Sequence, residues 1–224
     1  MAELGITLDP GQRAAIDAQA RLLVAWGGAI NLTAHRTPAA IALEHVIDSL
    51  TALEFVRGAA SLLDLGSGAG YPGVPLAICL SPIRTALVDS IGKKARFLEV
   101  VADAVAKELG TGHPPPIAVV RRRAEELARE PANREAWDVV TCRAVAAMPE
   151  LIALALPLLR RRGRLIAWKR DDGSGAFHEE MTAARETART SGGTSPEIHQ
   201  VAIVGLEDHR LVVVHKRRPM PVRW

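Results

Sequence analysis

The sequence predicts an α/β protein with a mostly parallel, seven-stranded sheet, helices on both faces and an N-terminal helical extension. Two observations lead to this prediction. From about residue 61 onward, short apolar segments typical of buried strands alternate with longer segments typical of helices, which is the pattern of parallel sheets. In addition, the segment Asp64-Leu65-Gly66-Ser67-Gly68-Ala69-Gly70 follows the first apolar segment and precedes a helix, which is the arrangement of a nucleotide-binding corner.

The first 57 residues show no strand pattern and are expected to form helices. Apolar residues recur at helical spacing from Pro10 to Ala25, and Trp26-Gly27-Gly28 ends that helix. Thr37-Pro38 is a capping residue followed by proline at the first helical position, and it predicts a second helix that Arg57-Gly58 stops. We therefore expect a helical extension over residues 1–57 and a Rossmann-like domain over residues 58–224.

The remaining elements alternate along the chain. Strands are predicted at Ser61–Leu65, Arg84–Val88, Ile117–Val120, Trp137–Thr141, Arg164–Trp168, Val201–Val204 and Leu211–His215. Helices are predicted at Pro72–Leu80, Gly92–Leu109, Ala124–Arg129, Pro149–Leu159 and Ala176–Thr190. No helix separates the last two strands, so one of them is expected to run antiparallel.

Composition limits the classes of function. The 224 residues suit one domain with an extension, and 48% hydrophobic residues suffice for a sizeable core. The net charge of +3 is compatible with a nucleic-acid partner without requiring one. The longest apolar run, residues 151–159, is too short for a membrane span, and the N-terminus lacks the pattern of a signal peptide. Cys79 and Cys142 lack the spacing of metal ligands or of a disulfide framework, so we expect a cytoplasmic protein with no metal site.

The glycine segment favours a cofactor that contains adenosine. Gly68, Gly70 and Gly73 fit the dinucleotide pattern G-x-G-x-x-G. The longer pattern D-x-G-x-G-x-G, which starts at Asp64 and includes Gly66, is the usual corner for S-adenosylmethionine. An acidic residue before the glycines suits the ammonium group of an amino-acid moiety and would repel a pyrophosphate.

Two later segments agree with such a cofactor. Asp89 ends the second predicted strand, about twenty residues after the glycines, where a carboxylate can accept hydrogen bonds from ribose hydroxyls. Its alternative role is to cap the following helix. Ala124-Glu125-Glu126 follows the third strand, where acidic residues are also favoured by the dipole of a helix.

Six segments, in order and spacing, resemble the RsmG (GidB) ribosomal RNA guanine-N7 methyltransferases. They are Trp26–Thr33 (W-n-x-x-x-N-L-T in the family), His45–Leu50 (H-i-l-D-S-l), Gly66–Pro75 (G-S/T-G-x-G-x-P-G-I/V-P), Asp89–Leu98 (D-S-x-x-K-R/K-x-x-F-L), Arg123–Glu126 (R-A/V-E-E/D) and Cys142–Ala146 (S-R-A-F/V-A). The sequence departs from the pattern at Cys142, where serine is expected, and at Lys169-Arg170, where lysine and glycine are usual. Near the C-terminus, His209 and Arg210 both remain candidates for the role of a late arginine.

The resemblance implies a class I methyltransferase that uses S-adenosylmethionine to methylate N7 of a guanine in 16S ribosomal RNA. The implied target is guanine 527 in conventional 16S numbering, in the decoding-region loop. It also implies a cofactor-corner role for Gly66 and Tyr71, an adenine-side role for Ala124-Glu125, and a role for Arg143 where cofactor and target base meet. The full set of predicted cofactor-binding residues is Gly66, Gly68, Gly70, Tyr71, Asp89, Ala124, Glu125 and Arg143.

Methyl transfer to guanine N7 needs no general base, because N7 carries a free in-plane lone pair. The enzyme must mainly align the nucleophile with the methyl carbon, and such alignment can supply about 7–11 kcal/mol of a barrier. Arg143 or Lys169 could donate a hydrogen bond to guanine O6, an acceptor beside N7. These two residues are therefore the predicted catalytic residues.

Basic residues are the predicted RNA contacts, through phosphate groups rather than base edges. They are Lys93, Lys94, Arg96, Arg121, Arg122, Lys169, Arg170, Arg210 and the tail His215-Lys216-Arg217-Arg218. The alternative for each of them is a solvated surface charge. The expected partner is 16S ribosomal RNA or the small ribosomal subunit, with a monomeric enzyme, no protein partner and no membrane.

Three other functions stay open from the residues themselves. Cys142 lies near the end of the fourth strand and could be the nucleophile of an RNA cytosine-C5 methyltransferase, although a small cysteine in apolar surroundings is most often core. The dinucleotide pattern allows a nicotinamide-dependent oxidoreductase, for which no hydride-relay Tyr or His is identified. A non-catalytic RNA-binding module would use the same basic residues.

Overall fold

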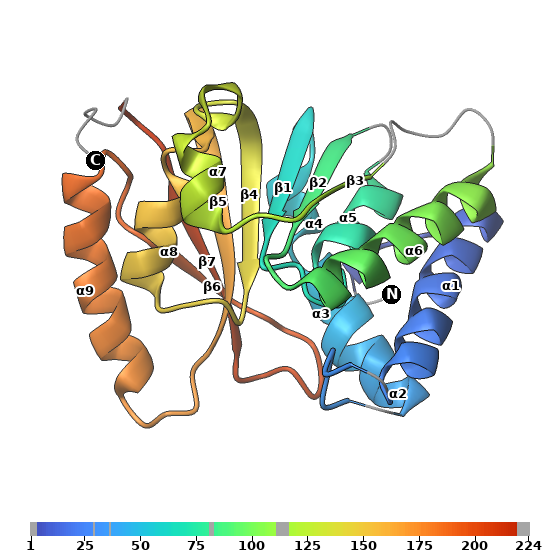
Figure 1. The fold of residues 1–224 in the computed structure, drawn as a ribbon. Helices are drawn as coiled ribbons and strands as arrows, with labels where there is room; N and C mark the ends of the chain where they lie inside the picture. The colour runs from blue at the N-terminus through green and yellow to red at the C-terminus, as the bar shows by residue number, and fades with distance from the viewer. Residues whose placement is uncertain (1–3, 29, 36, 81–82, 111–116, 219–224) are drawn as a thin grey trace. The chain divides into compact units, whose positions relative to one another are not determined.

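The structure is a computed structural model that describes residues 4–28, 30–35, 37–80, 83–110 and 117–218. The chain divides into two compact units, residues 1–122 and 123–224, whose elements are labelled in Figure 1. The expected boundary between residues 57 and 58 lies inside the first unit and stays a prediction. Ala29, within the first family-like segment, lies outside the described residues. None of the helices in the described ranges is long and apolar enough to cross a membrane.

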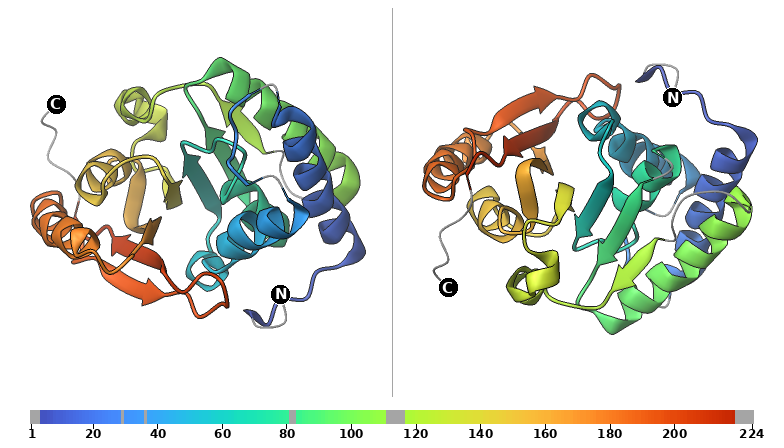
Figure 2. Two further views of the ribbon diagram at one scale, coloured as in Figure 1. Left: turned by 90° about the horizontal axis from the view of Figure 1, so that it is seen from below. Right: turned by 90° about the horizontal axis from the view of Figure 1, so that it is seen from above.

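The first unit begins with helix α1 (Pro10–Trp26), as predicted. Asp9 caps it, because its side chain accepts a hydrogen bond from the backbone N–H of Gln12 at 2.8 Å. Helix α1 packs along α6 (Gly92–Leu109), and the two lie side by side in Figures 1 and 2. Trp26 meets Phe97 of α6 edge to face, with ring centroids 5.6 Å apart.

The second predicted helix starts as expected but is interrupted. Thr37 caps its first turn by accepting a hydrogen bond from the N–H of Ala40 at 3.2 Å. The backbone then passes through four short pieces, namely α2 (Pro38–Ile41), the π-helix η2 (Ala42–Ile47), α3 (Asp48–Leu50) and α4 (Leu53–Val56). At the break between α3 and α4, the hydroxyl of Thr51 donates to the carbonyl of Asp48 at 2.6 Å, and such bonds compete with regular helix.

Three parallel strands complete the first unit together with α5 (Gly73–Cys79). They are β1 (Ser61–Leu65), β2 (Arg84–Val88) and β3 (Ala118–Val120), in the order β3-β2-β1. Every residue of β1 is buried, as is usual for parallel strands covered on both faces. The bounds of β1 and β2 are those predicted, and β3 starts one residue later.

The second unit contains four strands. They are β4 (Trp137–Arg143), β5 (Leu159–Arg170), β6 (Glu197–Gln200) and β7 (His209–His215), in the order β4-β5-β7-β6. Its helices are α7 (Ala124–Arg129), the single turn η3 (Pro131–Asn133), α8 (Met148–Ala155) and α9 (Ala176–Thr190). Strand β5 pairs with β4 in parallel and with β7 antiparallel, and β6 pairs antiparallel with β7.

The predicted fold class is confirmed. The strands form a seven-stranded sheet of order β3-β2-β1-β4-β5-β7-β6. The prediction that one of the last two strands is antiparallel is also confirmed, because β7 runs against both of its neighbours.

Several predicted boundaries are wrong, including the start of β5, which is Leu159 and not Arg164, and the start of β7, which is His209 and not Leu211. The sixth strand is Glu197–Gln200 and not Val201–Val204, because the polar segment forms the sheet edge while Val201 and Ile203 turn into the core without strand pairing. The helix predicted to reach Leu159 ends at Ala155, since Leu159 already pairs with Trp137 as the start of β5. Strand β4 continues two residues beyond its predicted end at Thr141 and includes Arg143.

Candidate active site

The glycine corner is the loop of residues 66–72 that joins β1 to α5. Gly66, Gly68 and Gly70 have φ angles of +67°, +54° and +86°, a left-handed backbone that glycine adopts without a steric penalty. Gly66 is exposed and Gly68 half-buried, whereas Ala69 and the residues that follow are buried. The loop therefore leaves main chain open at the carboxyl end of β1, where ligands of such sheets bind.

Ser67 and Asp64 hold this loop from inside. The N–H of Ser67 donates to the carbonyl of Val88 at 2.9 Å, and its hydroxyl accepts from the N–H of Val88 at 3.1 Å. Asp64 is fully buried, and its Oδ2 accepts a hydrogen bond from the N–H of Gly73 at 3.3 Å. The sequence suggested that Asp64 faces a ligand's ammonium group; the structure instead places its carboxylate inside, at the start of α5.

Asp89 joins the end of β2 to the glycine corner. Its Oδ2 accepts a hydrogen bond from the N–H of Gly68 at 3.0 Å, and its Oδ1 accepts one from the N–H of Ile91 at 2.8 Å. The structure thus brings two predicted cofactor residues, Asp89 and Gly68, into direct contact. Each carboxylate oxygen has more than one lone pair, so these bonds leave Asp89 able to accept from a hydroxyl as well.

Helix α1 supports the corner through Gln19, which sequence reasoning missed. Gln19 is fully buried, and its Nε2 donates to the carbonyl of Ala69 at 3.0 Å. Its Oε1 has no hydrogen-bond partner in the described part of the chain. A polar residue on the apolar face of the predicted helix, between Ile16 and Leu23, was the available signal.

Tyr71 is held by residues of the N-terminal segments. It is almost fully buried, and its ring stacks on that of His45 with centroids 4.8 Å apart and planes 19° apart. His45 lies in the π-helix, and its Nε2 is 2.7 Å from Oγ1 of Thr33. His35 meets the ring of His45 edge-on at 5.2 Å. Thr33 and His45, from two of the family-like segments, therefore form a chain of contacts that ends on Tyr71, in the third segment. Turns of π-helix like the one that holds His45 are frequent at functional sites.

In the second unit, Arg143 and Lys169 lie at the carboxyl ends of neighbouring parallel strands. Arg143 is the last residue of β4, is half-buried and pairs in register with Trp168 of β5. The next residue, Ala144, has a φ of +55°, a strained conformation of the kind that clusters at functional sites. Sequence reasoning placed Arg143 just past the strand; the structure places it within the strand.

Lys169 is tied to the loop that follows Arg143. Its Nζ lies 2.6 Å from Oε1 of Glu180 and donates to the carbonyl of Ala146 at 2.7 Å. The same carboxylate oxygen accepts from the N–H of Met148 at 2.5 Å. One ion pair between β5 and α9 therefore fixes both ends of the segment 146–148.

The other two predicted RNA contacts at this end of β5 also have carboxylate partners. Arg170 pairs with Asp208 at 3.0 Å. Arg210, opposite Lys169 in the β5–β7 pairing, pairs with Asp171 at 3.2 Å and donates to the carbonyl of Glu207 at 2.7 Å. His209, the alternative for the late arginine's role, is buried beside it.

The predicted RNA contacts of the first unit lie at or near the start of α6. Lys93 is exposed and Lys94 half-buried in its first turn, which contains no acidic residue. The guanidinium of Arg121 lies over Gly92, where a Cβ would be 3.0 Å from Cζ, and Arg122 is exposed next to it. Cations at the positive end of a helix dipole are unfavourable by themselves and favour a bound anion.

The remaining predicted residues take simple positions. Ala124 and Glu125 form the first turn of α7, with Glu125 exposed. Cys142 is fully buried in β4, so its thiol has no access to an RNA base in this structure. Burial raises the pKa of the Cys79 thiol to about 12, with a smaller contribution from Asp9. Among the described residues, no group of three or more His, Cys, Asp or Glu side chains could hold a metal ion.

Comparisons with known proteins agree with the geometry. The family model described as rRNA small subunit methyltransferase G (GidB) matches residues 12–204. The chain is 38% identical over 216 residues to the Ribosomal RNA small subunit methyltransferase G of Roseiflexus sp. (strain RS-1), which covers 96% of this chain and 88% of that protein. It is 32% identical over 227 residues to the protein of that name from Bacillus subtilis (strain 168), covering 100% of this chain and 90% of the relative.

A solved structure extends the likeness to the fold. The O-methyltransferase from Bacillus cereus, in complex with SAH, superposes with a TM-score of 0.59 at 17% identity, covering 94% of this chain and 93% of that one. At this identity the likeness concerns the fold alone. The family match over most of the sequence and the two full-length relatives go further, and on their evidence the chain belongs to the rRNA small subunit methyltransferase G (GidB) family.

Proposed function

We propose that this protein transfers a methyl group from S-adenosylmethionine to N7 of a guanine in 16S ribosomal RNA, guanine 527 in conventional 16S numbering. Membership of the family supports an RNA target in the small ribosomal subunit. The observation that carries the cofactor assignment is the open glycine corner with Asp89 bonded to Gly68. The similarity in fold to a methyltransferase solved with SAH supports the same cofactor.

The corner suits a ligand that carries adenosine and an amino-acid group. Gly66 is exposed and Gly68 half-buried, and neither has a side chain, so a ligand can lie directly against the loop. Asp89 accepts ribose hydroxyls, and Ala124 and Glu125 take the adenine side. Tyr71, buried under His45, fixes the far end of the loop. When bound, S-adenosylmethionine supplies a methyl group that its sulfonium makes electrophilic.

The work of the protein is then alignment. Guanine N7 already has its lone pair in the plane of the ring, so no residue must remove a proton. Arg143, at the carboxyl end of β4, donates to guanine O6 and sets the orientation of the base. Lys169 acts as a positioning residue, because its ammonium is bound to Glu180 and to the Ala146 carbonyl, three residues after Arg143.

RNA is held mainly through its phosphates. Lys93, Lys94 and Arg122 bind backbone phosphate at the start of α6, and Arg170 and Arg210 contribute at the end of β5. The predicted helical extension, residues 1–57, completes the cofactor corner through Gln19 and His45. We also propose that the enzyme acts as a monomer in the cytoplasm.

The test is methyl incorporation from labelled S-adenosylmethionine into 16S RNA, and into small subunits, that lack the modification. Labelled 7-methylguanosine at the proposed position is the expected product, and Arg143→Ala should lower its rate of formation. Label in 5-methylcytosine, or binding of NAD in place of S-adenosylmethionine, would contradict the proposal. Light scattering in the same buffer checks the monomeric state.

A further inference from the structure

A basic cavity lies at the start of β5 and the end of β7. Its volume is about 380 Å³, and its lining consists of Arg161, Arg162, His215, Lys216 and Arg217. Among the described residues that line the cavity, every one is an arginine, a lysine or a histidine. The sequence suggested that the tail 215–218 contacts RNA, but it did not indicate that two arginines of β5 join it.

The backbone fixes these side chains in place. The N–H of Arg162, whose φ is +68°, donates to the carbonyl of Lys216 at 2.9 Å, and the N–H of Lys216 donates to the carbonyl of Gly163 at 2.8 Å. The N–H groups of Arg217 and Arg218 both donate to the carbonyl of Gly192, at 2.9 and 3.1 Å. The basic residues therefore belong to a defined strand pairing and do not form a loose tail.

Three of the charges that line this cavity have no carboxylate partner in the described part of the chain, whereas the fourth, Lys216, has one. Lys216 is almost fully buried and is compensated, because its Nζ lies 2.8 Å from Glu135 and donates to the carbonyl of Leu159 at 2.8 Å. Arg161, Arg162 and Arg217 are exposed and have no carboxylate partner within the described ranges. Like charges that face one another across paired strands destabilise them, so the arrangement favours a bound anion.

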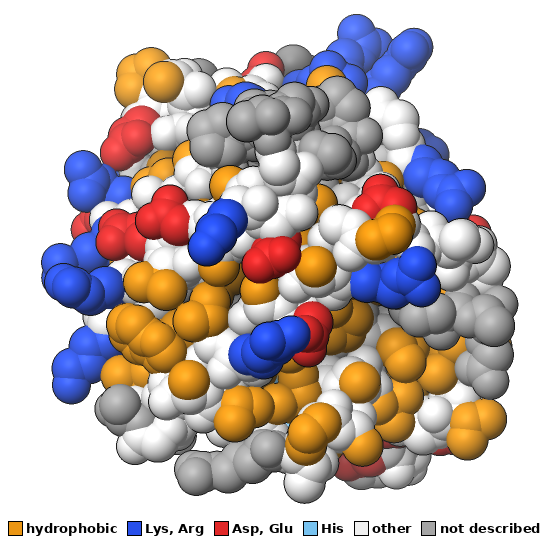
Figure 3. Space-filling model, turned by 90° about the vertical axis from the view of Figure 1, so that its right-hand side faces the viewer, with side chains coloured by type: hydrophobic (Ala, Val, Ile, Leu, Met, Phe, Trp, Pro, Cys, Tyr) orange, Lys and Arg blue, Asp and Glu red, His pale blue; other side chains and the backbone are white. Residues whose placement is uncertain are grey.

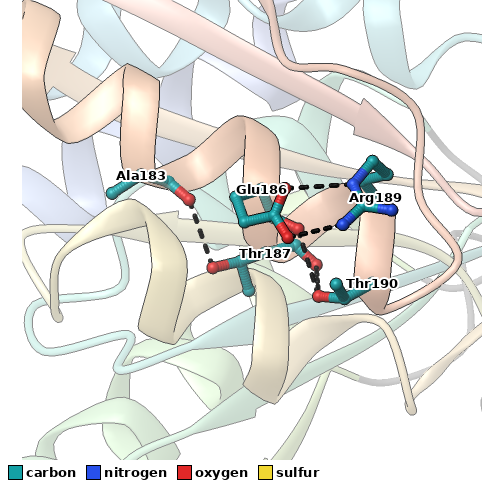
Figure 4. A network of polar contacts seen from close by, with 5 residues as sticks. All are labelled: Ala183, Glu186, Thr187, Arg189 and Thr190. Atoms are coloured by element: carbon teal, nitrogen blue, oxygen red, sulfur yellow. Dashed lines mark hydrogen bonds and ion pairs between the residues drawn. The ribbon is translucent and has the colours of Figure 1, made fainter.

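Four other cations of the same unit, unlike the cavity arginines, are each paired with a carboxylate. Lys169, Arg170 and Arg210, at the far end of β5, each have a carboxylate partner. On α9, both nitrogens of the Arg189 fork bind Glu186, at 2.6 and 3.0 Å, inside the polar network of Figure 4. The cavity therefore differs from these four positions, because it brings close together several arginines that have no carboxylate partner among the described residues.

We infer that this basic cavity binds backbone phosphates of the RNA substrate, as a second anchor away from the site of methyl transfer. Arg162 and Lys169 are seven residues apart on β5, and the strand is irregular near Arg162, so the cavity lies at most about 23 Å along the strand from the end that carries Lys169. The inference rests on the proposed function, because RNA is the polyanion that a ribosomal RNA methyltransferase must hold. Phosphate contacts at a distance give affinity and orientation without reading sequence.

The test measures direct binding of a 16S RNA fragment by the full chain over a series of salt concentrations. Arg161→Ala with Arg217→Ala removes two of the proposed contacts. The matched control is Arg21→Ala with Arg189→Ala, which removes two exposed arginines that are each paired with a carboxylate. Each phosphate contact with a single strand contributes about 0.7 to the steepness of log K against log salt, so losing two contacts should make the slope about 1.4 less steep. When the salt concentration falls from about 1 M to about 0.1 M, the RNA affinity of the cavity variant should therefore rise about 25-fold less than that of the wild type.

The control variant should keep the wild-type slope. Equal slopes for the cavity variant and the control would overturn the inference. So would stabilisation of the wild type by inorganic phosphate without any loss of RNA affinity in the cavity variant, which would indicate a site for free phosphate. Loss of binding to polyglutamate with RNA binding retained would indicate an acidic protein partner and would overturn it as well.

Methyl transfer is measured separately, so that the two proposals can fail independently. If the wild type does not methylate 16S RNA, the proposed function fails whatever the binding data show. If the wild type methylates the RNA and the cavity variant binds like the control, only the present inference fails. The cavity variant should raise the KM for RNA and keep kcat at saturating RNA. Circular dichroism checks folding, and Arg161→Gln with Arg217→Gln replaces the variant if the alanines prevent it.

Discussion

Alanine at Gly68 and at Gly70 should separate the two tasks of the glycine corner, which are to face a ligand and to pack against the protein. Both residues have positive φ, so alanine at either position costs about 1–2 kcal/mol of unfolding free energy through backbone strain. They differ in what the new Cβ would meet. At Gly70 it would lie 2.9 Å from Cγ2 of Val74 and 3.0 Å from Nε2 of Gln19, whereas at Gly68 the nearest atom is the Gly66 carbonyl oxygen at 3.8 Å.

Overpacking of a core site adds about 1–3 kcal/mol, so Gly70→Ala should lose about 2–5 kcal/mol in all. Gly68→Ala should lose only the strain, about 1–2 kcal/mol. The order reverses for the cofactor. The Cβ of Gly68→Ala enters the open side of the loop, where the ligand lies, and should weaken S-adenosylmethionine at least about tenfold, which corresponds to about 1.4 kcal/mol.

Urea unfolding followed by circular dichroism gives the stabilities, and titration calorimetry gives the cofactor affinities. Gly28→Ala is the control, because Gly28 has no positive φ and no atom of the described residues lies within 4 Å of its Cβ position; it should change neither quantity. Equal stability losses at Gly68 and Gly70 would refute the packing argument. Wild-type affinity for S-adenosylmethionine in Gly68→Ala would refute the placement of the ligand at this loop.

Three further changes test separate parts of the structure. Asp89→Asn places an amide NH₂ against the N–H of Gly68 or of Ile91, so one of these two hydrogen bonds is lost. The variant should lose about 1–3 kcal/mol of unfolding free energy in urea and should bind S-adenosylmethionine more weakly by calorimetry. Lys169→Met should leave Glu180 unpaired and lower kcat more than cofactor affinity, and adding Glu180→Gln should restore stability in a double-mutant cycle. Because burial raises the pKa of the Cys79 thiol from its ordinary value of 9.0 to about 12, the free energy of unfolding should fall as the pH rises from 9 to 12, and Cys79→Ser should flatten that fall. The half-buried Cys79 thiol should also react slowly with Ellman's reagent at about pH 8 until the protein unfolds.

Local signals predicted the elements that have strong boundaries. Helix α9 and strands β1 and β2 have the predicted limits, because their periodicity and flanking turn residues agree with their tertiary environment. The sixth strand shows where such signals fail. The Val201–Val204 segment has the higher strand propensity, yet backbone pairing with β7 falls on Glu197–Gln200. An edge strand needs partners for its backbone more than it needs apolar side chains, and the sequence alone does not reveal that pairing.

The candidate site was predictable where function depends on the backbone and not where it depends on tertiary support. Glycines in a strand-to-helix turn indicate an open loop, and the aspartate after the next strand could be placed from chain order alone. The partner of Tyr71 could not, because His45 reaches it through a π-helical turn that a regular helical pattern does not predict. Apolar side chains of α1 and of α2–η2 also line a groove of about 580 Å³, within the face drawn in Figure 3, where periodicity predicted only buried helix faces.

Counting basic residues in the sequence does not show which of them are neutralised in the folded protein. The acids that neutralise the predicted RNA contacts are distant in sequence, since Asp208 is 38 residues from Arg170 and Asp171 is 39 residues from Arg210. A list of basic residues therefore overstates how much charge the carboxyl end of β5 offers to RNA. The net charge of +3 is the small remainder of many such pairs, so its location matters more than its size. In the second unit, Arg161, Arg162 and Arg217 gather at one cavity, and phosphate binding should follow these residues more closely than it follows the total number of arginines.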